Sequence, residues 1–204
     1  MRKDYIRSLT KGILRSVDKV NKYHDTLIDH VLETSLCSVY YQVHAQAPKA
    51  LGQYTKRYSA QTISTDSTLT RYYHTLTIQP VTLPDKRGGV RSIVDQSDTD
   101  VYFVPVTDQE LLLMDEAQAD ALLTTTPIVV YYVVRPDRIE FKNMSATLAA
   151  HTLTIDMIPT FTDLADTDDI PLPYGKHLEI IRSALELLGV IPPKDLLDNN
   201  SDVK

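Results

Sequence analysis

The 204-residue sequence contains no tryptophan, a single cysteine and no long run of hydrophobic residues. Without a second cysteine, Cys37 cannot form an internal disulfide bond, which fits folding in a reducing compartment. The charged N-terminus is not followed by an uninterrupted apolar stretch, so we expect neither a signal peptide nor a transmembrane helix. Internal repeats and low-complexity tracts are lacking as well. These absences predict a soluble protein with an ordinary hydrophobic core.

Sequence signatures of catalysis and metal binding are also lacking. The six histidines are scattered, and no H-E-x-x-H or C-x-x-C motif supplies metal-ligand spacing. Cys37 lies seven residues from both His30 and His44, a spacing that does not make a thiol and an imidazole converge. The acidic residues within 163–169 lack the glycine and the terminal glutamate of a calcium loop, and the glycines at 88–89 lie outside any phosphate-binding motif. We therefore expect no enzymatic activity, no metal, no cofactor and no small-molecule substrate.

Charge is distributed unevenly along the sequence. The net charge is -6, but residues 1–22 carry seven Lys or Arg against two Asp, whereas residues 155–204 carry ten Asp or Glu against four Lys or Arg. A basic beginning and an acidic end suit head-to-tail contacts between identical neighbours, and an ordinary solvated surface is the other interpretation. The overall acidity argues against broad affinity for nucleic acid.

Hydrophobic periodicity predicts two consecutive helices at the beginning of the chain. The first is expected over about residues 4–21 and the second over about 24–46, where Pro48 ends it. Asn21 and Asp25 are candidate N-caps of the second helix, so we favour a short break over one continuous helix.

A third helix is expected near the end of the chain, directly after the Ile-Pro-Leu-Pro run that finishes at residue 173. Gly189 ends this helix, because glycine readily adopts the left-handed conformation that closes a helix, and the following Pro192-Pro193 prevents its resumption. The predicted apolar face consists of Tyr174, Leu178, Ile181, Leu185 and Leu188.

The middle of the chain is rich in β-branched and aromatic residues, which predicts strands. We expect them at residues 61–64, 71–79, 90–94, 102–106, 128–134, 138–141 and 152–158. The run 128–134 is apolar on both faces, so it is expected to be a central strand that pairs with 138–141 across a turn containing Pro136. A helical insertion is predicted over residues 108–123.

A basic loop at residues 83–89 follows strand-like residues 72–82 and precedes the strand at 90–94. Proline near its entrance and a glycine pair at its exit define its shape, because proline restricts φ and glycine allows positive φ. Lys86 and Arg87 stand at its tip. An exposed turn is the simplest interpretation of this loop, and a charged interface is the alternative.

Together these elements predict an α+β protein. We expect the terminal helices to pack as a helical bundle, with a sandwich- or barrel-like β-rich region inserted between them. A single domain would cover residues 1–189, with the helical part at 1–48 and 170–189 and the β-rich insertion at 49–169. An extended C-terminal tail would follow at residues 190–204.

Three groups of residues are candidates for interfaces. Five cations recur every four residues along one side of the first helix, where they could face an acidic neighbour, nucleic acid or only solvent. The other two groups are the cations of the basic loop and the one apolar pair within residues 194–204 of the tail, which could dock onto a partner. The candidates are Lys3, Arg7, Lys11, Arg15, Lys19, Lys86, Arg87, Leu196 and Leu197.

Several motifs, in their order and spacing, resemble the head-to-tail connector or ring proteins of crAss-like and related tailed phages. They are the N-terminal helical stretch, Tyr72-Tyr73, the run Q-P-V-T-L-P-D-K-R-G-G-V at residues 79–90, Asp95-Gln96, and D-D-I-P-L-P at residues 168–173. The resemblance spans about two-thirds of the chain. The insertion at residues 108–123 has no match in the pattern.

The resemblance implies a structural virion protein of the phage neck. Such a subunit would form a ring of about twelve copies that connects the portal to the tail and surrounds the DNA ejection channel. Its partners would be identical subunits, the portal protein and other neck or tail rings, with non-specific contact to packaged DNA, and assembly would take place in the host cytoplasm. No membrane is implied. The alternative is an accessory DNA-binding phage protein that uses the basic N-terminal helix.

Overall fold

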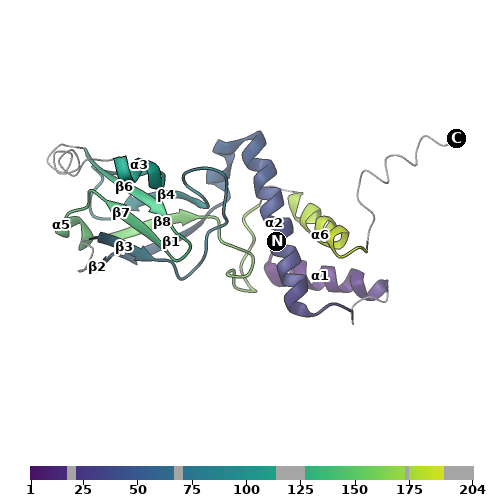
Figure 1. The fold of residues 1–204 in the computed structure, drawn as a ribbon. Helices are drawn as coiled ribbons and strands as arrows, with labels where there is room; N and C mark the ends of the chain where they lie inside the picture. Colours follow the sequence, from purple (N-terminus) through teal and green to yellow (C-terminus); the bar gives the residue numbers. More distant parts are fainter. Residues whose placement is uncertain (18–21, 67–70, 114–126, 173–174, 191–204) are drawn as a thin grey trace. The chain divides into compact units, whose positions relative to one another are not determined.

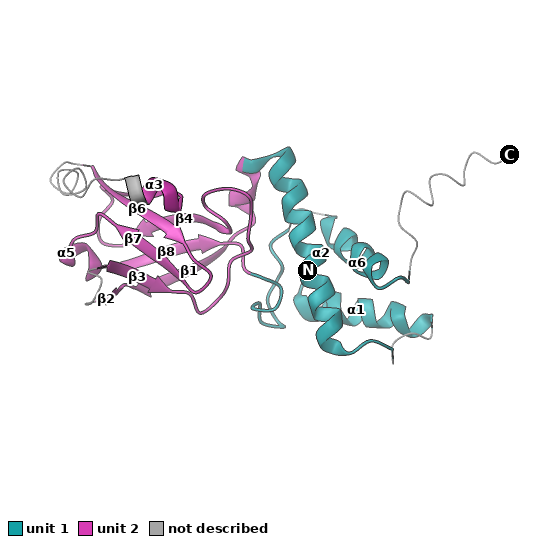
Figure 2. Ribbon diagram, viewed as in Figure 1, with its two compact units in different colours: residues 1–48, 160–204 teal, residues 49–159 magenta. Residues whose placement is uncertain are grey.

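The computed structural model describes residues 1–17, 22–66, 71–113, 127–172 and 175–190. Helices and two β-sheets make it an α+β protein (Figure 1). The chain divides into two compact units (Figure 2). The helical unit contains residues 1–48 and 160–204, and the β unit contains residues 49–159.

The helical unit contains α1 (Lys3–Ser16), α2 (Asp25–Gln46) and α6 (Lys176–Leu187). The two separate N-terminal helices confirm the predicted break, although residues 18–21 lie outside the described part of the chain. The predicted caps of the second helix are wrong, because His24 occupies the N-cap position and its side chain accepts a hydrogen bond from the Thr26 amide. α6 packs against both α1 and α2, so both ends of the chain contribute to one unit.

The predicted apolar face of α6 is partly wrong. Leu178 is 62% exposed, whereas Ile180, Ile181, Ala184 and Leu185 are buried. The prediction assumed one narrow face, with apolar residues alternately four and three positions apart. The buried residues instead form two adjacent pairs, 180–181 and 184–185, one helical turn apart. This wider buried face suits a helix that packs against two neighbouring helices. Tyr174 lies outside the described residues.

The end of α6 follows the prediction. Gly189 adopts φ +64°, and its amide donates to the Glu186 carbonyl oxygen while the Val190 amide donates to that of Leu185. These two bonds define the glycine-closed helix end known as the Schellman motif.

The β unit contains two sheets. In the first, β8 (Thr152–Met157) lies between β1 (Lys56–Thr62) and β4 (Val90–Asp95), antiparallel to both. The second has the order β2 (Ser64–Asp66), β3 (Arg71–Thr75), β7 (Arg138–Lys142), β6 (Ile128–Val134) and β5 (Val101–Pro105), and only its β5–β6 pair is parallel. Two predictions are confirmed: residues 128–134 form an interior strand, and this strand pairs with the one that contains residues 138–141. The described strands form no closed barrel, so the barrel-like alternative is not supported.

Some strand boundaries differ from the prediction. The beginning of β1 was missed, because its sequence K-R-Y-S-A-Q-T has few β-branched residues and a mostly exposed edge position. β3 ends at Thr75 rather than at residue 79. The short helices are a 3-10 turn (η2, Pro48–Gln53), α3 (Asp108–Leu113) and α5 (Ala146–Ala149), and only the first residues of the predicted insertion at 108–123 are described.

One hydrophobic cluster of the β unit takes residues from both sheets. Ile93 and Ile155 come from the first sheet, and Val130, Ile139 and Phe141 come from the second. Buried and partly buried positions alternate in β8, and the buried ones supply Leu153, Ile155 and Met157 to this cluster from one face of the strand.

The loop at residues 83–89 does not join paired strands, because β3 and β4 lie in different sheets. Its ends are held by backbone bonds to the segment after β8: the Val81 amide donates to the Ile158 carbonyl oxygen at 2.8 Å, and the Ile158 amide donates to that of Gly89 at 2.9 Å. Gly88 has φ +53°, as predicted for one of the two glycines. A side chain on Gly89 would lie 2.5 Å from the Val81 carbonyl oxygen, so that position excludes any Cβ.

Candidate interaction site

The N-terminus of α1 is bound to the segment between β8 and α6. The first amides of a helix lack partners within the helix, and here the Lys3 and Asp4 amides donate to the carbonyl oxygens of Asp168 (2.9 Å) and Asp166 (3.0 Å). Arg2 occupies the N-cap position without a side-chain capping bond. A distant segment of the chain therefore caps α1.

Lys3 is the first cation of the predicted stripe, and it is only 4% exposed. Its ammonium donates to the carbonyl oxygens of Leu164 (2.7 Å) and Thr162 (3.1 Å) and lies 5.2 Å from the centre of the Phe161 ring. Burial lowers the pKa of Lys3, and the neighbouring charge of Arg7 acts in the same direction. The side chain is thus held inside the helical unit.

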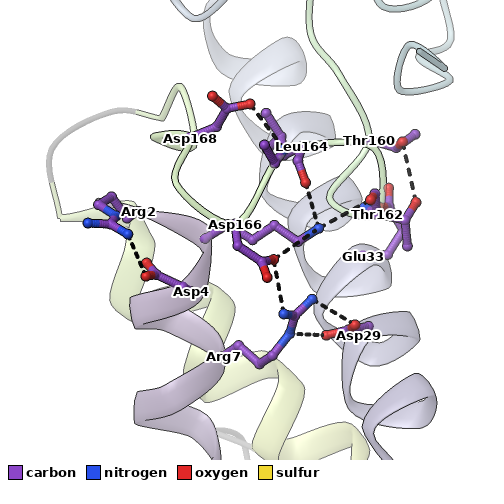
Figure 3. Close-up of polar contacts among 12 residues, drawn as sticks. Arg2, Asp4, Arg7, Asp29, Glu33, Thr160, Thr162, Leu164, Asp166 and Asp168 are labelled. Carbon is purple, nitrogen blue, oxygen red and sulfur yellow. Dashed lines mark hydrogen bonds and ion pairs between the residues drawn. The ribbon is translucent and has the colours of Figure 1, made fainter. Parts of the chain in front are cut away.

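Arg7 joins three elements of the helical unit (Figure 3). Its Nε and Nη2 donate to the two carboxylate oxygens of Asp29 on α2, at 2.7 and 2.8 Å, and its Nη1 donates to Asp166 at 3.0 Å. The bidentate bond to Asp29 raises the pKa of Arg7. α1, α2 and the 160–170 segment are therefore tied together by one guanidinium.

The remaining cations of the stripe differ in their surroundings. Lys11 forms a 2.7 Å ion pair with Asp25 and lowers the pKa of that carboxyl group. Arg15 is exposed near the end of α1, and Lys19 lies outside the described residues. Three of the five cations thus contact backbone carbonyls or acidic residues of the same unit.

Sequence reasoning missed these partners because Asp29 and Asp166 lie 22 and 159 residues from Arg7. The one available signal was the opposite charge of the two chain ends, which we assigned to contacts between neighbouring molecules. At least part of this opposite charge is paired within one chain, because Arg7 near the beginning bonds to Asp166 near the end.

The basic loop also contains internal ion pairs. Lys86 pairs with Glu110, and this bond together with the Thr107 amide lowers the pKa of Glu110 to about 2. Asp85 accepts from the Arg87 amide and from the guanidinium of Arg91, which also donates to the Gly88 carbonyl oxygen. The Arg87 side chain is exposed at the tip of the loop.

The apolar pair Leu196 and Leu197 lies outside the described residues, so its placement stays a prediction. The described ranges contain no helix long and apolar enough to cross a membrane, and no group of three or more potential metal ligands.

Cys37 and the pair formed by His151 and Asp95 are two described groups with nucleophile or base chemistry. Burial raises the pKa of Cys37 to about 12, with the Glu33 carboxylate adding to the effect, so the thiol stays protonated. His151 Nδ1 lies 2.8 Å from a carboxylate oxygen of Asp95, whose other oxygen accepts from the Ser97 and Asp98 amides. Sequence reasoning missed this pair, since its members are 56 residues apart.

No protein-family model matches the chain, and a search of curated proteins finds no match.

Proposed function

We propose that the protein is a structural virion protein, a subunit of an oligomeric ring in the neck of a tailed phage. The ring would contain about twelve copies, connect the portal protein to the tail and surround the DNA channel. The subunit would act through repeated weak contacts whose number makes the assembly stable, without an enzymatic step or a cofactor.

In this proposal the three helices form a bundle that holds the subunit together, and the β unit is a sandwich-like insertion for contact with an adjacent ring. The observation that carries the proposal is the ordered series of motifs at residues 72–96 and 168–173. Backbone hydrogen bonds are consistent with it, because they hold both motif regions in defined conformations: Ile158 bonds to Val81 and Gly89, and the first amides of α1 donate to the carbonyl oxygens of Asp166 and Asp168. The tail from residue 190 would grip a neighbouring subunit.

The alternative of an accessory DNA-binding protein requires a free basic face on the first helix. Lys3, Arg7 and Lys11 are engaged by backbone carbonyls or by Asp29, Asp166 and Asp25 within the helical unit, which disfavours that alternative. A DNA-binding protein would shift free duplex at low salt and lose it steeply as salt is added.

A mass-spectrometric inventory of purified particles tests the proposal. We expect the chain in virions at about twelve copies per particle, and in rings by electron microscopy when portal protein is present. Absence from virions together with a monomeric state in the presence of portal would contradict it.

The exposed Arg87 allows a sharper test of the interface. Reversing its charge with Arg87→Glu should reduce incorporation into particles while leaving the subunit folded, because the side chain is exposed and has no ion-pair partner among the described residues. Lys49→Glu makes the same charge change at an exposed position of η2 and serves as the control. Equal incorporation of both variants would leave the loop as a turn without an interface role.

A further inference from the structure

The second sheet of the β unit has a buried face and an opposite face of unusual composition. Val130, Ile139 and Phe141 belong to the hydrophobic cluster on the buried face. Because successive side chains of a strand alternate between the two faces, their neighbours along each strand point to the opposite side. We call that side the tyrosine face, and its members outside the cluster include Tyr73, Tyr102, Tyr131, Arg71, Arg138 and Lys142.

Two tyrosines of this face are accessible on neighbouring strands. Tyr102 of β5 is 56% exposed and Tyr131 of β6 is partly exposed, while Val104, which is paired with Tyr131, is 38% exposed. Tyr102 is paired with Val129, two residues before Tyr131. With about 4.8 Å between strands and about 3.3 Å per residue, the two tyrosine Cα atoms are about 8 Å apart. A sheet face in contact only with water would normally carry polar residues at these positions.

Cations stand beside Tyr131 on the tyrosine face. β3, β7 and β6 are neighbours in this order (Figure 1). Lys142 of β7 is paired directly opposite Tyr131. Arg71 of β3 is the next residue across the sheet, since Tyr72 is paired with Phe141, and it is exposed. One row across three strands therefore consists of a tyrosine, a lysine and an arginine.

The acidic residues on the strands of this face are outnumbered. Glu140 accepts hydrogen bonds from Arg135 and Arg138, so its charge is compensated. Asp66 of β2 is paired with Arg71. The three cations of the tyrosine face against these two acids leave one excess positive charge, in a chain whose net charge is -6. A local reversal of charge in an acidic protein favours an anionic partner over an ordinary solvated surface.

We propose that the tyrosine face binds single-stranded nucleic acid, with two bases stacked on Tyr102 and Tyr131 and backbone phosphates bound by Lys142 and Arg71. Aromatic side chains on a sheet stack on unpaired bases of any sequence, and cations beside them bind the phosphates. Bases of a duplex are about 3.4 Å apart and stack on one another, so rings about 8 Å apart can each reach a base only in an unpaired strand.

This site lies entirely within the β unit and shares no residue with the basic N-terminal helix. The inference does not rest on the connector proposal, in which DNA is contacted non-specifically inside a channel and no single strand is required. Either can therefore fail without the other.

Fluorescence anisotropy of the full-length chain with labelled oligothymidylate and oligouridylate of about 12 nucleotides tests the proposal at low salt. We expect binding of at least one, and the tighter of the two identifies DNA or RNA as the source. Tyr102→Ala should weaken binding about tenfold, because one base loses its stacking partner, whereas Tyr102→Phe keeps the ring and should bind as the unchanged protein does. Tyr5→Ala, at a tyrosine of α1 that is 54% exposed, is the matched control and should change nothing.

The salt dependence tests the phosphate contacts separately. Arg71→Gln should reduce the slope of log affinity against log salt concentration by about 0.7, the value for one phosphate of a single strand. Arg15→Gln removes an exposed cation of α1 and should leave the slope unchanged. Circular dichroism checks that each variant stays folded. No binding of either oligonucleotide by the unchanged protein, or equal effects of Tyr102→Ala and Tyr5→Ala, would overturn the proposal.

Discussion

At the scale of single residues, two adjacent glycines in the basic loop have different physical roles. Gly88 adopts φ +53° with open space where a side chain would stand, whereas a Cβ on Gly89 would collide with Val81 and Pro80. The first position needs glycine for its backbone conformation and the second for close approach of two chain segments. Sequence reasoning supplied the first reason but not the second, because Val81 becomes a neighbour of Gly89 only through the fold.

The two glycines should therefore respond differently to alanine. We expect Gly89→Ala to lower the free energy of unfolding by about 3 kcal/mol, since backbone atoms at 2.5 and 2.7 Å must move. Gly88→Ala should lower it by about 1 kcal/mol, the usual cost of a left-handed alanine. Urea unfolding of both variants measures the difference, and equal losses would contradict the assigned roles.

At the scale of elements, α1 is held in the helical unit by contacts that lie far apart in the sequence. Its amides are capped by residues 166–168, and Arg7 reaches both α2 and the 160–170 segment. The helix itself was predictable from its apolar spacing, whereas the partners of its cations were not, because an exposed helix and a packed helix have the same periodicity.

Two arginines on α1 provide a matched test of this anchoring. Arg7→Met should lower the free energy of unfolding by about 2 kcal/mol, because it removes charge-assisted bonds and leaves Asp29 without its partner. Arg15→Met removes the same charge at an exposed position and should change it by less than about 0.5 kcal/mol. Similar losses in the two variants, measured by urea unfolding, would show that Arg7 contributes only its charge.

At the scale of the whole molecule, the two units contain groups that titrate in different pH windows. Burial lowers the pKa of His177 in the helical unit, and the positive charge of the chain's amino group adds to the effect. In the β unit, Lys86 and the Thr107 amide lower the pKa of Glu110 to about 2. The first group responds to mild acid and the second only to strong acid.

Mild acid should therefore weaken the folded state through His177. A histidine whose pKa is lower in the folded state contributes stability above its unfolded pKa of about 6.5, and that contribution is lost as the pH falls below this value. The contribution of Glu110 is instead present above its unfolded pKa of about 4.5 and is lost as the pH falls toward 2.

Urea unfolding at pH 7 and pH 5 measures the loss of stability through His177, because the contribution of Glu110 is lost only at lower pH. His177→Gln, which keeps a donor for the Ile170 carbonyl oxygen, should show a smaller drop between these pH values than the unchanged protein. An unaltered pH dependence in His177→Gln would rule out this residue as its source.

The sequence by itself determined the α+β class, the two N-terminal helices, the paired strands β6 and β7, and the end of α6 at Gly189, because apolar periodicity, turn residues and caps act over a few positions. The tertiary structure decided which α6 face is buried, that β3 and β4 belong to different sheets, why Gly89 must be glycine, and which carboxylates hold Arg7. These features depend on residues that meet only after folding, and local patterns do not record such distant partners. The same reason explains why the cations of α1 read as an exposed stripe, although three of them lie in contacts within their own unit.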